Sequence, residues 1–158
     1  MAEHSPQISV SQSPNAKVAI ISASWHMDIC AALVAGARRA CAEAGINSPS
    51  ERYVPGSFEL PLAAQHAFES GFDAVVVVGL VLRGETPHFD YVCQGVTQGI
   101  MDVQLKFSKP IGFGVLMCET LEQAHARSGV AGSKEDKGYD AALAALTLIR
   151  AHGGAPAN

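Results

Sequence analysis

The stretch Asp73-Ala-Val-Val-Val-Val-Gly-Leu-Val-Leu-Arg-Gly-Glu-Thr-Pro-His-Phe-Asp90 decides how this chain is expected to fold. Residues 74–82 form an almost unbroken apolar run rich in β-branched side chains, which is typical of a strand buried on both faces. A short polar loop with one glycine follows at residues 83–86. Thr86-Pro87 then predicts a helix start, with Thr as N-cap and Pro at the first helical position. Open α/β sheets place ligands at such a junction, so His88 in the first helical turn becomes a candidate site residue.

The rest of the chain repeats this alternation of apolar strands and amphipathic helices. Strands are predicted at residues 17–22, 51–54, 74–82 and 110–117, and helices at about 29–44, 57–70, 87–107, 120–128 and 136–152. Ser57 is expected to cap the second helix. Strands that alternate with helices imply right-handed βαβ units, and hence a parallel sheet of about four strands covered on both faces.

The predicted fold class is therefore a three-layer α/β/α, flavodoxin-like domain. It is expected to span residues 17–152, after a flexible N-terminal arm at residues 1–16 and before a frayed tail at residues 153–158. A chain of 158 residues suits one such domain, and an apolar fraction of 48% with 16% charged residues suits a folded globule.

Charge and cysteine usage narrow the function classes. The net charge is −4 and the eleven Lys and Arg are scattered, which argues against nucleic-acid and membrane-surface partners. The apolar runs are too short for a membrane helix, and the polar N-terminus does not resemble a signal peptide. The four cysteines form no C-x-x-C pair and lie in apolar patterns, so we expect reduced thiols in a cytoplasmic protein.

Four loops follow the carboxyl ends of the predicted strands, and these ends should meet at one edge of the sheet. The loops are residues 24–26, 55–59, 82–88 and 117–120. Trp25, Phe58 and Glu59 in these loops suit a flat heterocycle with N–H groups. The loop Gly84-Glu85-Thr86 opens a helix, and backbone N–H groups at a helix start suit an anion. The residues alone thus predict a small-molecule site at the strand ends.

Each candidate also has a purely structural explanation. Trp25 can be a packing residue, Glu59 can serve only to favour a helix N-terminus, and His88 can be a surface residue of a first turn. Gly84 alone is a weak phosphate signal, because the sequence contains neither a Walker A nor a G-x-G-x-x-G pattern. His, Cys and Asp do not cluster with metal-ligand spacing, so no metal is predicted.

Five motifs, in order along residues 17–150, resemble the 6,7-dimethyl-8-ribityllumazine synthase family. They are Val54-Pro-Gly-Ser-Phe-Glu-Leu-Pro61, Gly79-Leu-Val-Leu-Arg-Gly-Glu-Thr-Pro-His-Phe-Asp-Tyr-Val92, Phe113-Gly-Val-Leu116, Glu122-Gln-Ala-His-Ala-Arg-Ser-Gly129 and Lys137-Gly-Tyr-Asp-Ala-Ala142. The resemblance implies a transferase of riboflavin biosynthesis. Such an enzyme condenses 5-amino-6-ribitylaminouracil with 3,4-dihydroxy-2-butanone 4-phosphate to give 6,7-dimethyl-8-ribityllumazine, phosphate and water. The resemblance implies that no cofactor is needed.

The resemblance also implies a role for each matching residue. His88 corresponds to the general acid/base and Arg127 to the phosphate-binding arginine. The implied substrate-binding residues are Trp25 as the stacking aromatic, Ser57, Phe58 and Glu59 at the ring edge and ribityl chain, Leu80, Val81 and Leu82 in the ring pocket, Gly84, Glu85 and Thr86 at the phosphate, Phe113 from an adjacent subunit, and Lys137 near the phosphate.

Assembly and two competing functions complete the expectations. The resemblance implies self-association into pentamers, and Ser24-Trp25-His26 in place of Arg-Phe-Asn is similar to a subtype that forms a decamer. Asp136 stands where a common Asn-Lys-Gly has Asn. A non-catalytic flavin- or lumazine-binding protein on the same scaffold would not need both His88 and Arg127. A flavodoxin-like electron carrier would need a Ser/Thr-rich phosphate loop, which residues 22–25 match poorly.

Overall fold

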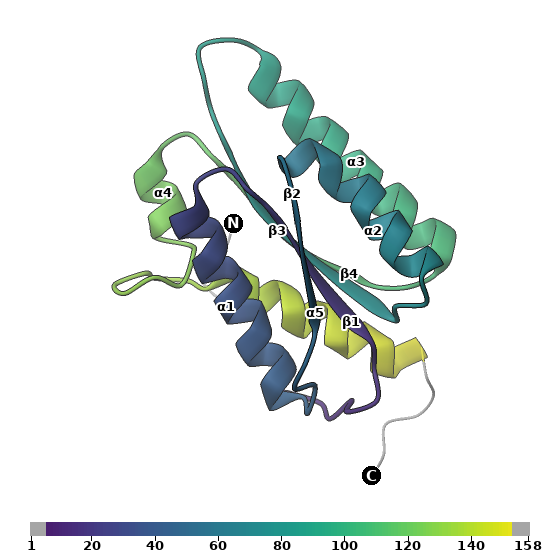
Figure 1. Ribbon diagram of the computed structural model, residues 1–158. Coiled ribbons are helices and arrows are strands. Elements are labelled where there is room, and N and C mark those ends of the chain that lie inside the picture. The colour runs from purple at the N-terminus through teal and green to yellow at the C-terminus, as the bar shows by residue number, and fades with distance from the viewer. Residues whose placement is uncertain (1–5, 153–158) are drawn as a thin grey trace.

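The valine-rich stretch forms a central strand of a four-stranded parallel sheet (Figure 1). The computed structural model describes residues 6–152, so the predicted tail at 153–158 and the first five residues of the predicted arm lie outside it. The strand order is β2-β1-β3-β4, and the strands are β1 (Val18–Ala23), β2 (Ser50–Val54), β3 (Ala74–Leu82) and β4 (Ile111–Cys118). Every residue of β1 is buried, as are the first seven of β3. The predicted parallel sheet is confirmed.

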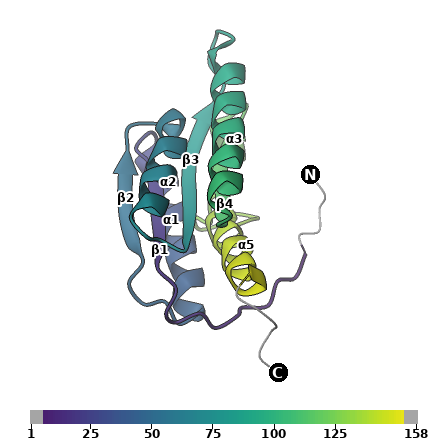
Figure 2. The ribbon, with the colours of Figure 1, turned by 90° about the vertical axis from the view of Figure 1, so that its right-hand side faces the viewer.

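Two layers of helices cover the sheet, which confirms the three-layer prediction (Figure 2). The helices are α1 (Met27–Glu43), α2 (Leu60–Glu69), α3 (His88–Phe107), α4 (Leu121–His125) and α5 (Lys137–His152). Helices α1 and α5 pack together on one face, and α2 and α3 pack together on the other. Within residues 6–152, no helix has the length and apolarity needed to cross a membrane.

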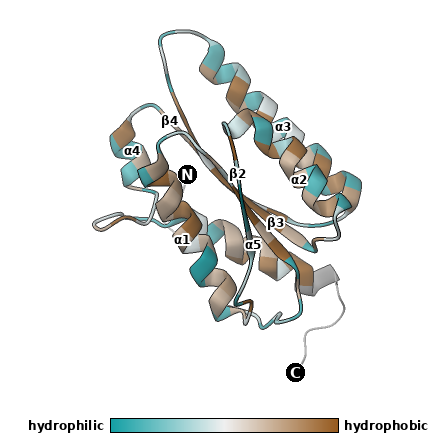
Figure 3. Cartoon of the chain, in the orientation of Figure 1, coloured by the Kyte–Doolittle hydropathy of each residue, from teal (hydrophilic) through white to brown (hydrophobic). Residues whose placement is uncertain are grey.

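The strands divide their side chains between two cores, because successive strand residues point to opposite faces. In β1, Val18 and Ile20 belong to the core under α1 and α5, whereas Ala19 and Ile21 belong to the core under α2 and α3. The apolar residues of the strands stand out when the chain is coloured by hydropathy (Figure 3). A sheet buried on both sides thus explains the continuous apolar runs of the sequence.

Helices α1 and α5 approach each other closely because a glycine lies at their contact. A Cβ atom at Gly138 would lie 2.0 Å from the carbonyl oxygen of Leu33, so no larger residue fits there without a shift of the backbone. The start of α5 is held by Asp136, whose Oδ1 accepts a hydrogen bond from the Tyr139 N–H at 3.0 Å. Arg39 of α1 reaches the other oxygen of the same carboxylate at 2.7 Å.

Two predicted helix starts were wrong in detail. Ser57 does not cap a helix: it begins a 3₁₀ turn, η1 (Ser57–Glu59), and its hydroxyl is buried without a hydrogen-bond partner. The Glu59 carboxylate accepts from the Gly56 N–H at 2.9 Å instead, because a three-residue offset brings it back to the turn. Helix α3 begins at His88 rather than at Pro87, and Thr86 Oγ1 accepts from the His88 N–H at 3.4 Å.

The helix predicted at 120–128 is shorter in the structure. Thr120 caps it as a capping box with Gln123, and it ends at His125. The chain then turns back on itself, because an antiparallel bridge joins Ser128 to Asp136. The backbone N–H of Lys137 donates to the carbonyl of Arg127 at 2.9 Å, which keeps these two cationic residues next to each other.

Candidate functional site

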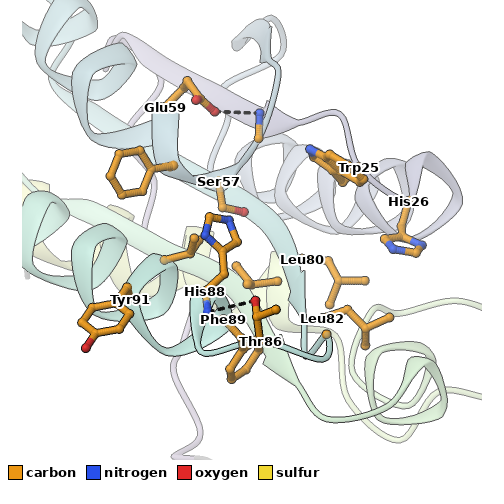
Figure 4. A pocket seen from close by; sticks show the side chains of 15 residues that line it. Trp25, His26, Ser57, Glu59, Leu80, Leu82, Thr86, His88, Phe89 and Tyr91 are labelled. Atoms are coloured by element: carbon orange, nitrogen blue, oxygen red, sulfur yellow. Dashed lines mark hydrogen bonds between the residues drawn. The ribbon is translucent and has the colours of Figure 1, made fainter.

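The main cavity lies where the direction of the sheet's connections reverses. From β1 the chain continues to β2 on one side, and from β3 it continues to β4 on the other, so β1 and β3 form the switch point at which open α/β sheets bind ligands. The cavity has a volume of about 740 Å³. Its lining residues are Trp25, His26, Gly56, Ser57, Phe58, Glu59, Leu80, Val81, Leu82, Gly84, Thr86, His88, Phe89, Tyr91 and Val92 (Figure 4).

The end of β3 offers an open backbone edge to this cavity. The β1–β3 ladder ends at Ser22–Val78, whereas β3 stays paired with β4 as far as Leu82–Cys118. In the described sheet, residues 80–82 therefore have a neighbouring strand on one side only. Backbone N–H and C=O groups on the free side can bind a planar ligand that lies against the edge, as another strand would.

The loop after β1 carries Trp25 on the cavity wall. The Ser24 hydroxyl donates to the Val54 carbonyl at 2.8 Å, which ties this loop to the end of β2. The thiol of Cys30 donates to the Trp25 carbonyl at 3.1 Å, so the loop is also held from α1. The Trp25 side chain remains 65% exposed. A structural role in the core does not explain an indole in this position, and a flat ligand can stack on it.

His26 lies next to Trp25 in an unusual backbone conformation. Its φ is +52° and its ψ is +65°, which places it in the left-handed region that side chains with a Cβ rarely adopt. His26 also precedes the first residue of α1, so the turn that aims Trp25 is the same turn that starts the helix. The identity of residue 26 therefore affects both the cavity and the helix.

The turn Ser57-Phe58-Glu59 forms the opposite wall. Ser57 is 5% exposed, and a Cβ at Gly79 would lie 2.6 Å from its Oγ, so the glycine in β3 makes room for this hydroxyl. A buried hydroxyl without a protein partner on a cavity wall is suited to a hydrogen bond with a ligand. The Phe58 ring lies over Gly95 of α3, where a Cβ would be 2.9 Å from the ring.

The loop between β3 and α3 is fixed mainly by Arg83. Its guanidinium pairs with Glu119 at 2.5 Å and with Asp90 at 3.2 Å, and it lies 4.3 Å from the centre of the Phe89 ring. These contacts connect the ends of β3 and β4 to the first turn of α3. Gly84 and Thr86 line the cavity, whereas Glu85 does not. His88 projects into the cavity from the first turn of α3, toward the wall that carries Ser57 (Figure 4).

Four residues singled out in the sequence do not line the cavity: Glu85, Phe113, Arg127 and Lys137. Phe113 lies in the edge strand β4, 40% exposed. Arg127 follows α4 and Lys137 starts α5, and both contact Glu135. Within one chain, the ring-binding candidates and His88 therefore line one cavity, and this second group lies outside it.

Sequence reasoning placed His26 near the site without giving it a binding role, and it missed Gly56, Phe89, Tyr91 and Val92 as lining residues. Tyr91 and Val92 follow His88 by three and four positions, the spacing that puts residues on one helix face, so this signal was available.

The cysteines are free thiols, and burial raises the pKa of Cys41 to about 11. Within residues 6–152, no group of three His, Cys, Asp or Glu side chains is arranged to hold a metal ion.

Comparison with known proteins gives a consistent result. Residues 15–152 match the family model described as 6,7-dimethyl-8-ribityllumazine synthase. Curated proteins with that name include one from Streptomyces coelicolor, 51% identical over 141 residues, which cover 89% of this chain and 88% of the relative. One from Paenarthrobacter aurescens is 56% identical over 130 residues, covering 82% and 80%. One from Kineococcus radiotolerans is 49% identical over 153 residues, covering 96% and 94%.

Proposed function

The chain belongs to the 6,7-dimethyl-8-ribityllumazine synthase family, and from this premise we propose that the cavity between the ends of β1 and β3 is its active site. The protein is a transferase of riboflavin biosynthesis. It condenses 5-amino-6-ribitylaminouracil with 3,4-dihydroxy-2-butanone 4-phosphate and releases 6,7-dimethyl-8-ribityllumazine, phosphate and water. The roles of individual residues below are our proposal.

The uracil ring binds between Trp25 and the free edge of β3. The exposed indole supplies a stacking face, and Leu80, Val81 and Leu82 supply an apolar wall with backbone groups beside it. The turn Ser57-Phe58-Glu59 holds the ring edge and the ribityl chain. The observation that carries this assignment is that the unpartnered Ser57 hydroxyl and the His88 imidazole line the same apolar cavity.

His88 moves the protons of the reaction, because imidazole is the side chain best suited to exchange protons near neutral pH. The uracil's amino nitrogen attacks the carbonyl carbon of the butanone, and loss of water gives an imine. A proton is then removed from C3 of the butanone, and the C–O bond to phosphate breaks with its electron pair on the phosphate oxygen. The resulting enol takes up a proton at its terminal carbon and loses its hydroxyl proton, which makes C3 a second carbonyl. Attack by the ribityl-bearing nitrogen on the second carbonyl closes the ring, and loss of water completes the product.

The phosphate end of the site needs residues from a second copy of the chain. Gly84, Glu85 and Thr86 offer the loop at the start of α3, and Arg127 and Lys137 offer the cations, yet these two do not line the cavity of their own chain. We propose that an adjacent subunit supplies them together with Phe113. Self-association into pentamers, and into a decamer in the Trp25-His26 subtype, would bring these groups together.

We propose the cytoplasm as the location, on the basis of the free cysteines.

A two-substrate assay tests the enzyme assignment. Pure protein with both substrates should release phosphate well above the slow spontaneous rate, and His88→Ala should lower that rate roughly 10- to 1000-fold. The low end of that range reflects the spontaneous reactivity of the substrates. His66→Ala is the matched control, because that exposed imidazole lies on α2 and does not line the cavity. Phosphate release at the spontaneous rate would leave a ligand-binding protein instead.

Arg127→Ala tests the assignment of the phosphate end. We expect the KM for the phosphate-bearing substrate to rise far more than the KM for the uracil, because only the former carries the dianion that the guanidinium binds. Initial rates measured while one substrate is varied at a time separate the two constants. An equal rise in both would remove Arg127 from this role.

A further inference from the structure

The carboxylate of Glu135 lies between the two cations that we assign to phosphate. Its Oε1 is 2.8 Å from Lys137 Nζ, and its Oε2 is 3.6 Å from Arg127 Nε. The two oxygens of one anion thus contact two different cations, as two oxygens of a bound phosphate would. Lys137 also lies 3.5 Å from Asp140, so the four charges of this cluster sum to zero.

The backbone holds Glu135 in this place. Its N–H donates to the Ala126 carbonyl at 3.0 Å, and its carbonyl accepts from the Gly129 N–H at 3.1 Å. The loop that follows α4 therefore returns beside Arg127 and presents Glu135 to it. The hydrogen bond from Lys137 holds the pKa of the Glu135 carboxyl below its usual value, so the side chain is an anion at neutral pH.

We propose that Glu135 is an internal counter-ion that the phosphate group of the substrate must displace, and that it returns to the cations when inorganic phosphate leaves. The proposal rests on the proposed function, because it takes Arg127 and Lys137 as the phosphate cations. Such a carboxylate keeps the two cations oriented and neutralised in the free protein. It lowers the affinity for phosphate in exchange for faster release of the product.

The cluster is accessible enough for this exchange. The side chains of Arg127, Glu135 and Lys137 are 44%, 34% and 30% exposed in the chain, so the carboxylate can rotate toward solvent. Pairs with this exposure contribute little net free energy, because water competes with both partners. A phosphate dianion carries more charge than a carboxylate and has more acceptor oxygens, so it can replace Glu135 on both cations.

Replacement of Glu135 by Gln tests the proposal, because it removes the charge and keeps the size. We expect the Kd for inorganic phosphate, measured by calorimetry without the other substrates, to fall roughly 3- to 10-fold. The KM for the phosphate-bearing substrate should fall similarly, while the KM for the uracil stays unchanged. Glu122→Gln is the control, an exposed carboxylate of α4 for which the described residues provide no ion pair.

A purely orienting role for Glu135 predicts the opposite sign. Phosphate binding that is unchanged or weaker in Glu135→Gln, or that tightens equally in Glu122→Gln, overturns the proposal. Phosphate binding that is the same in Arg127→Ala as in the wild type also overturns it, because the cations would then not bind phosphate. Normal turnover in that variant would leave the proposed function intact, so the two failures can be told apart.

Discussion

The two helical layers of this protein differ in how their outer surfaces are completed. Charged and polar pairs cover the layer of α1 and α5: Arg38 with Glu51, Arg39 with Asp136, and Tyr139 with Glu43. The layer of α2 and α3, with η1 and the β4 edge beside it, instead exposes large apolar side chains. They are Phe58, Leu62, Tyr91, Met101, Leu105 and Phe113.

This difference divides the molecule into two layers. The layer of α1 and α5, which we call the closed layer, is covered by contacts within the chain. The layer of α2 and α3, which we call the open layer, is expected to pack against another copy of the chain. Among the described side chains, α1 and α5 each expose one large apolar residue, Met27 and Leu148. Several large exposed apolar side chains on one layer, as on the layer of α2 and α3, are typical of an interaction surface. On this second side, η1 and the first turns of α3 line the cavity, and Arg127 and Lys137 of the same chain do not. The incomplete surface and the incomplete site thus occur together.

The largest expected effect comes from a break in the closed layer. Gly138→Val places a branched side chain where a Cβ alone would lie 2.0 Å from the Leu33 carbonyl oxygen, so α1 and α5 must separate. We expect a loss of at least about 3 kcal/mol in the free energy of unfolding, measured by urea denaturation. Ala144→Val, at an exposed position of the same helix, should change it by less than about 1 kcal/mol. Equal losses would show that the close helix contact is unimportant.

A charge on the open layer tests its role directly. Leu105 of α3 is 69% exposed and Leu148 of α5 is 51% exposed, so the same substitution can be made on each face. Leu105→Asp should shift the protein to smaller species in light scattering and lower the rate of phosphate release by more than about 10-fold, while the fold is retained. Leu148→Asp should leave the assembly unchanged. If only Leu148→Asp dissociated the assembly, the layer of α1 and α5 would be the contact surface between copies instead of the layer of α2 and α3.

The turn at His26 connects the two sides, because it aims Trp25 at the cavity and starts α1. His26→Val should cost about 1–2 kcal/mol, since a β-branched residue is strained at a φ of +52°. His26→Asn should be neutral or slightly stabilising, because Asn tolerates this region. Thermal unfolding of both variants measures the difference. A stable His26→Val variant would mean that the turn can adopt another backbone conformation.

The smallest expected effect on stability comes from the ion pair between Arg38 and Glu51 on the surface of the closed layer. The hydrogen bond from Arg38 lowers the pKa of Glu51, so this pair stabilises the fold above the ordinary carboxyl pKa of about 4.3 and loses its effect as the pH falls through the lowered value. Arg38 is half exposed, so Arg38→Gln should cost less than about 1 kcal/mol at pH 7. In urea titrations, the difference between variant and wild type should shrink as the pH falls below the ordinary carboxyl pKa and should be lost once Glu51 is protonated in the folded protein. A difference independent of pH would point to packing rather than charge.

Much of the fold could be predicted from the chain because periodicity depends on local sequence. The run at residues 74–82 and the amphipathic stripe after His88 gave β3 and α3 to within one residue. The helix predicted at 120–128 failed at its end, because the bridge between Ser128 and Asp136 is a contact that periodicity does not encode. Ser57 failed as a cap for a similar reason: Glu59 competes for the turn, and Gly79 of β3 accommodates the hydroxyl.

For the candidate site, residue order alone was enough to predict which chemical groups are present and that loops 24–26, 55–59 and 82–88 share one edge of the sheet. Parallel strands make that inference general, because all their carboxyl ends lie together. Three properties became visible only in the folded chain: the Ser57 hydroxyl has no partner, the edge of β3 is free at residues 80–82, and Glu135 lies between Arg127 and Lys137. These properties depend on distances between segments far apart in the chain, which residue order does not specify.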